Sequence, residues 1–109
     1  MSFAPNVGYL LLYTARQSDL EFQQNLIINN LQQLIAIGTR IISVAASTDP
    51  LSPDQARVAA LTAAVQQQEK ALRLTLARLQ SEYQVVTKMI DSIRKLITKN
   101  VEMSFKTFG

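Results

Sequence analysis

The side chains that most often carry catalysis are scarce in this sequence, which has no cysteine, no histidine and eight acidic residues. Thiolate and imidazole chemistry, disulfides and metal sites built on cysteine or histidine are therefore excluded. Asp19 and Glu21 stand two positions apart, so their carboxylates diverge on a helix. Asp49 and Asp54 flank a proline-containing stretch, where turn and capping roles explain them. We expect no catalytic residue, no metal site, no cofactor and no small-molecule substrate, and hence a protein that is not an enzyme.

Most of the positive charge belongs to the second half of the chain, where four lysines share one side of a predicted helix. These are Lys88, Lys95, Lys99 and Lys106. Such a stripe could bind an anionic surface, either the phosphates of a nucleic acid or a membrane. Asp91 lies four positions before Lys95, however, and Glu102 interrupts the stripe. We therefore favour a solvated helix face and keep anion binding by these lysines as the weaker alternative.

The stretch STDPLSPDQ, residues 47–55, divides the sequence into two long segments. Pro50 disfavours helical conformation in the residue before it. Ser52 and Gln55 match a capping box, in which each side chain bonds the backbone N–H of the other residue. The sequence therefore predicts a helix over about 5–46, a reversal over 47–52 and a second helix over about 53–107.

Apolar residues recur every seven positions in both segments, which is typical of helices that pack side by side as coiled coils do. The row of the first helix is Leu20, Ile27, Leu34 and Ile41, and that of the second includes Val65, Leu72, Leu79, Val86 and Ile93. We place Ile28, Ile35 and Ile42 on the same side as the first row. A further row runs through Leu76, Tyr83, Ile90 and Ile97. Its seven-residue spacing is expected to break at Gln68, which is one residue out of register. The predicted fold is all-α, a long antiparallel helical hairpin that forms a single domain over residues 1–109.

Apolar side chains also gather near both ends of the sequence, at the end of the hairpin opposite the turn. They are Leu10, Leu11, Leu12, Tyr13, Met103, Phe105 and Phe108. The two ends could cover each other within one chain, or they could dock to neighbouring subunits. Because each of two helices has only one partner face, we expect oligomerisation to complete the hairpin, with these residues as the oligomer interface.

The first helix is a poor membrane span, because asparagines, glutamines and Arg40 interrupt its apolar stretch. The N-terminal segment lacks the basic region and the small-residue cleavage pattern of a signal peptide. We expect a protein that is not transmembrane. Its location stays open between the cytoplasm and export without a cleavable signal peptide.

In layout, with a Pro-Asp turn between two helices and an apolar C-terminal helix, the chain resembles small exported helical-hairpin subunits such as type III secretion needle and inner-rod proteins. The resemblance covers the architecture and implies a structural subunit of an export assembly. The second helix is longer here than in such a needle, and the absence of tryptophan excludes the secreted hairpins that carry Trp-x-Gly. Three hypotheses follow: a self-assembling structural subunit, an adaptor that binds other helical proteins, and, as the weakest, a binder of nucleic acid or membrane surfaces.

Overall fold

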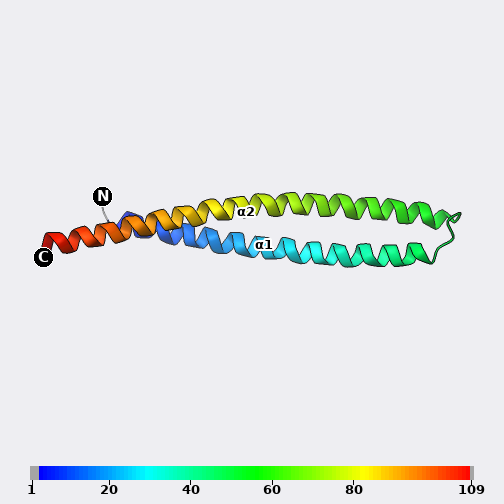
Figure 1. Cartoon of the computed structure of the whole chain (residues 1–109), viewed down its shortest axis with the longest axis horizontal. Coiled ribbons are helices and arrows are strands. Elements are labelled where there is room, and N and C mark those ends of the chain that lie inside the picture. Colours follow the sequence, from blue (N-terminus) through cyan, green and yellow to red (C-terminus); the bar gives the residue numbers. More distant parts are fainter. Residues whose placement is uncertain (1–2, 109) are drawn as a thin grey trace. The chain divides into compact units, whose positions relative to one another are not determined.

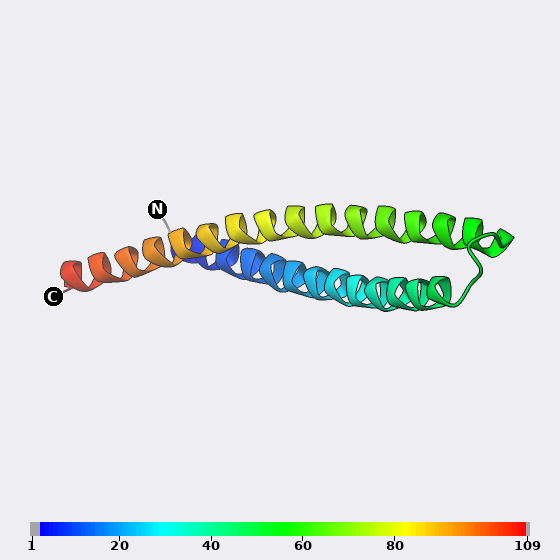
Figure 2. The same ribbon diagram turned by 45° about the vertical axis from the view of Figure 1, so that its right-hand side comes forward.

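The chain is a hairpin of two long helices. A computed structural model describes residues 3–108, with side chains described for 5–106. Helix α1 spans Phe3–Ala46 with 44 residues, and α2 spans Pro53–Phe108 with 56. Each is one continuous ribbon in both views (Figure 1 and Figure 2), and no strand occurs in residues 3–108. The all-α hairpin is confirmed, with α1 beginning at Phe3 instead of about residue 5 and α2 ending at Phe108 instead of about residue 107.

The two helix ends at the turn are capped by hydroxyl groups. At the end of α1, the carbonyl oxygen of Val44 accepts hydrogen bonds from the hydroxyls of Ser47 at 3.0 Å and Thr48 at 2.7 Å. At the start of α2, the hydroxyl of Ser52 accepts from the backbone N–H of Asp54 at 3.2 Å. Since helix ends leave backbone groups without helical partners, these bonds explain why the helices stop and start here.

The side chain of Gln55 has a different role from the one that the capping box predicts. The backbone N–H of Ser52 already donates to the carbonyl oxygen of Asp49 at 2.9 Å. The Gln55 amide instead donates to the carbonyl oxygens of Thr48 at 3.1 Å and Ala45 at 3.3 Å. Both halves of the predicted box are therefore wrong, because the Ser52 hydroxyl accepts from Asp54 and the N–H of Gln55 donates to the backbone carbonyl of Ser52 at 3.0 Å. The side chain of Gln55 instead ties α2 to the end of α1.

We expect Gln55→Glu to destabilise the hairpin by about 1 to 3 kcal/mol, because a carboxylate cannot donate to these carbonyl groups and is repelled by the negative end of α1. Chemical denaturation followed by circular dichroism measures the loss. The control is Gln66→Glu on the exposed surface of α2, which should change stability by less than about 0.5 kcal/mol. Equal effects of the two substitutions would contradict the role assigned to Gln55.

Contacts within the structure divide the chain into two compact units. One unit, here called the terminal unit, combines α1 up to Gln23 with α2 from Leu79 onward. The other, here called the turn unit, is Gln24–Arg78. That residues 1–109 form a single domain stays a prediction.

The better-buried core lies in the terminal unit. There Leu20 is fully buried, and Leu79, Val86 and Ile90 are buried as well. In the turn unit Leu31 is the one buried apolar side chain among the residues described. The remaining row residues are half-buried, namely Ile27, Leu34, Ile41, Val65 and Leu72 in the turn unit and Ile93 in the terminal unit. Full burial of a large apolar side chain contributes about 1.5 to 3 kcal/mol, so the terminal unit gains more from its core.

The rows of α2 keep their seven-residue step from Gln55 to Asn100. Gln68 is exposed, whereas Glu69, Thr62 and Gln55 are half-buried at successive steps of seven before Leu76. The predicted break in the seven-residue spacing at Gln68 is therefore wrong. The residues of this row are polar before Leu76 and mostly apolar from Leu76 onward, but their spacing is unchanged.

We expect Leu79→Ala to destabilise the protein by about 2 to 5 kcal/mol, because Leu79 is buried and the substitution leaves a cavity. The matched control is Leu74→Ala, whose side chain is 65% exposed and whose loss should stay below about 0.5 kcal/mol. Thermal and urea denaturation measure both. A loss at Leu79 no larger than that at Leu74 would show that this face of α2 is not a core.

Candidate assembly surface

Polar side chains fix the register of the two helices in the terminal unit. Three hydrogen bonds join the helices: Arg16 to Glu82 at 2.8 Å, Gln17 to Thr87 at 3.1 Å and Tyr83 to Glu21 at 2.9 Å. An exposed ion pair such as Arg16–Glu82 contributes only about 0 to 1 kcal/mol, and a hydrogen bond such as Gln17–Thr87 about 0.5 to 1.5 kcal/mol. A slip of α2 along α1 by one heptad would break all three, so their main effect is on register.

The hydroxyl of Tyr83 titrates differently from a free tyrosine. It donates to Oε1 of Glu21, and this hydrogen bond raises the pKa of Tyr83 above its ordinary value of 10.0. The raised pKa means that the folded chain favours the neutral phenol. The bond's contribution to stability is therefore fully present below about pH 10 and is lost as the pH rises through the raised pKa.

We expect Tyr83→Phe to lower the melting temperature at pH 7, and the gap from the unmodified protein to shrink above pH 10 as the phenol ionises beside Glu21. Melting curves of both proteins across pH 7 to 11 measure this. Tyr9→Phe removes a hydroxyl from the same unit and is the control for general alkaline effects. A gap that stays constant with pH would argue against the Tyr83–Glu21 bond.

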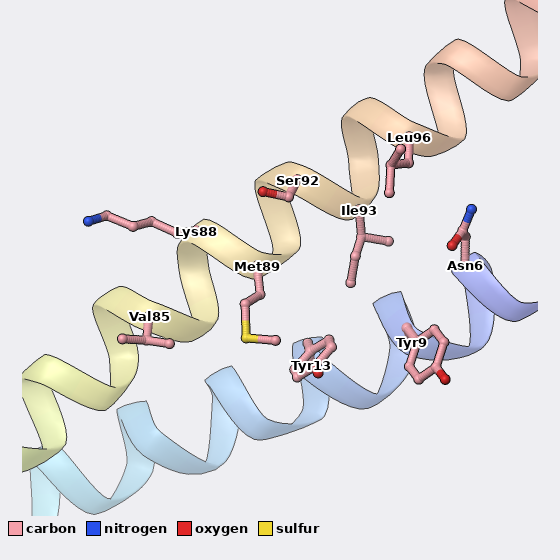
Figure 3. A pocket seen from close by; sticks show the side chains of 9 residues that line it. All are labelled: Asn6, Tyr9, Tyr13, Val85, Lys88, Met89, Ser92, Ile93 and Leu96. Carbon is pink, nitrogen blue, oxygen red and sulfur yellow. The ribbon is translucent and has the colours of Figure 1, made fainter.

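An open groove of about 630 Å³ lies between the helices in the terminal unit (Figure 3). Tyr9 and Tyr13 of α1 line it together with Met89 and Ile93 of α2, and Tyr13 lies beside Met89. Asn6 lies at one end of the groove; it is 4% exposed, and its Nδ2 has no hydrogen-bond partner among the described residues. The groove is mainly apolar, with one polar side chain left unsatisfied.

The apolar residues near the chain ends remain largely uncovered within one chain. Leu10 and Tyr13 are half-buried, but Leu11, Leu12 and Phe105 are between 63% and 75% exposed. Met103 is also exposed, and the side chain of Phe108 lies outside the described residues. The last turns of α2 run on past the start of α1 (Figure 1), and residues 101–106 are all exposed. The interface role of these residues stays a prediction.

The four lysines of the predicted stripe, Lys88, Lys95, Lys99 and Lys106, are all exposed. Asp91 and Glu102 line the same shallow surface as Lys95 and Lys99. Carboxylates among the lysines weaken the field that an anionic surface would meet. Anion binding here stays a prediction.

The structure exposes apolar residues that the sequence-based placement missed. Ile28, Ile35 and Ile42 form a line on α1 of the turn unit, here called the isoleucine flank, and are 39%, 48% and 66% exposed. Their placement on the packing side is wrong, because each follows a row residue by one position and is therefore turned by about 100° around the helix. The sequence contained a signal for this, because apolar residues stand next to each other at 27–28, 34–35 and 41–42, and two adjacent residues cannot both face the same neighbour.

A second line of exposed apolar residues lies on the other side of α1 in the turn unit. It consists of Leu26, Ile37 and Val44, here called the second flank, with exposures between 45% and 55%. Ile37 and Val44 line a shallow groove together with Arg40 and with Leu61 of α2. This part of α1 is thus apolar on more sides than one neighbouring helix covers, and helices with apolar residues on all sides are normally buried.

Known proteins supply no further guide to the role of these surfaces. No protein-family model matches the chain, and neither a curated protein nor a solved structure is significantly similar to it. Within the described residues, no three acidic side chains lie together as a metal site would require. Neither described helix contains a stretch long and apolar enough to cross a membrane.

Proposed function

We propose that this protein is a non-enzymatic structural subunit, which self-associates through helix packing into a homo-oligomer or filament. The observation that carries the proposal is the accessible surface of the chain, 8158 Å² for a mass of 12.1 kDa. A compact monomer of this mass exposes roughly 6,000 Å². The excess of about 2,000 Å² per chain is more than the roughly 800 Å² that each partner buries in a standard stable interface.

The distribution of that surface also supports self-association. Both units expose large apolar side chains, among them Leu11 and Phe22 in the terminal unit and Ile42 in the turn unit. Apolar patches on a protein surface mark interaction sites, and the isoleucine flank is a line of three exposed apolar residues at seven-residue steps. Helices present the apolar surface throughout, so another helix is the partner of matching shape.

A place in an export assembly is the more specific form of this proposal, and it rests on the architectural resemblance alone. An adaptor for other helical proteins is the second candidate. The groove with the unpaired amide of Asn6 favours it, because a partner with a hydrogen-bond acceptor would satisfy Nδ2.

The purified protein is expected to sediment as a species larger than 12.1 kDa, with a mass that rises with concentration. Sedimentation velocity over a hundredfold range of concentration measures this, with circular dichroism on the same samples. Electron microscopy then separates closed rings from filaments. A helical protein that remains monomeric at the highest concentration would contradict self-assembly and leave the adaptor.

A further inference from the structure

The surface best suited to self-association is the isoleucine flank of the turn unit. Ile28, Ile35 and Ile42 lie about 100° from the row that faces α2, so they are on a flat side of the hairpin to which both helices contribute. Resting on the proposed function, we infer that this flank docks against the isoleucine flank of a second copy of the chain, related by a two-fold axis near Ile35.

The turn unit buries fewer apolar side chains within one chain than the terminal unit does. Among the residues described there, Leu31 is its one buried apolar side chain, while the isoleucine flank is 39% to 66% exposed. Two neighbouring helices give a side about 20 Å wide, and the 23 residues of α1 from Gln24 to Ala46 are about 35 Å long. A side of about 700 Å² is close to the area that each partner buries in a stable dimer.

The charge of this part of α1 identifies a protein surface as the occupant. Between Glu21 and Asp49 the one charged residue is Arg40, which lines the groove of the second flank. The isoleucine flank therefore carries no charge of its own, and depletion of charge is characteristic of interface cores. A nucleic acid or an anionic membrane requires basic residues, which are absent from the α1 part of this side. In α2 of the turn unit, Lys70 and Arg73 lie beside Glu69, which weakens their attraction for an anionic surface.

The spacing of the three isoleucines matches the same flank of another copy. They recur at seven-residue steps on either side of Ile35, so an antiparallel two-fold arrangement places Ile35 against Ile35 and Ile28 against Ile42. Neighbouring polar groups do not prevent this contact. The Thr39 hydroxyl, for example, already donates to the carbonyl oxygen of Ile35 at 2.9 Å.

Substitution by glutamate tests the surface, because a charge buried between copies lacks a partner. Ile35→Glu should lower the sedimenting mass to 12.1 kDa without loss of helicity. The control is Leu74→Glu on α2, 65% exposed, which should keep the mass of the unmodified protein. If Ile37→Glu on the second flank or Phe105→Glu near the chain end releases monomers while Ile35→Glu does not, the inference is wrong and self-assembly stands. If the unmodified protein is monomeric, the proposed function itself fails.

A cross-linking experiment keeps the test valid even if Ile35→Glu unfolds. The chain has no cysteine, so Ile35→Cys introduces a single thiol. Across the proposed two-fold axis the two Cα atoms come within the roughly 4.4 to 6.8 Å that a disulfide requires. Mild oxidation of a dilute sample should convert most of the Ile35→Cys protein to a covalent dimer and leave Ile37→Cys largely monomeric. Equal or preferential cross-linking of Ile37→Cys would overturn the inference.

Discussion

A helix can bury only one stripe of its surface against one neighbour, and this limit governs the whole protein. The buried and half-buried positions of both helices follow heptad steps, so each helix offers the other a single narrow face. In α2 most of the remaining surface is polar, and water satisfies it. In the turn unit α1 has apolar residues on both sides of that face as well. The pairing of the two helices leaves these uncovered, which is why self-association is central to the proposed function.

The two units differ in how much each buries between its two helices. The terminal unit has a fully buried leucine, Leu20, and three polar bridges that set the register of its helices. The turn unit has fewer buried groups and is closed by hydrogen bonds of Gln55 to the end of α1. Its polar row residues, Thr62 and Glu69, pack less apolar area than the leucines and isoleucines of the terminal unit. The physical contrast is in the core, because the terminal unit buries Leu20, Leu79, Val86 and Ile90 whereas Leu31 is the one buried apolar side chain described in the turn unit.

Local signals were sufficient to predict the helices and the turn. Pro50 and Ser52 act on their immediate neighbours, so their effects can be deduced without knowledge of the fold. The bonds of Gln55 could not be deduced in this way, because they depend on α1 returning to the start of α2. The isoleucine flank was misplaced because rows at positions 27 and 28 were treated as one face, although one residue turns a helix by about 100°. Which of two adjacent apolar rows faces the partner is a tertiary question.

Asn6 and Asn100 give the terminal unit an unequal resistance to opening. The Nδ2 atoms of both are buried and have no hydrogen-bond partner among the described residues. A buried donor without a partner costs about 1 to 3 kcal/mol, and water satisfies it as soon as the helices separate. The first turns of α1 therefore detach from α2 at a lower free energy than the turns around Leu20. Their backbone amides exchange hydrogen with solvent by local fraying, while those beside the buried leucine exchange mainly when the whole unit unfolds.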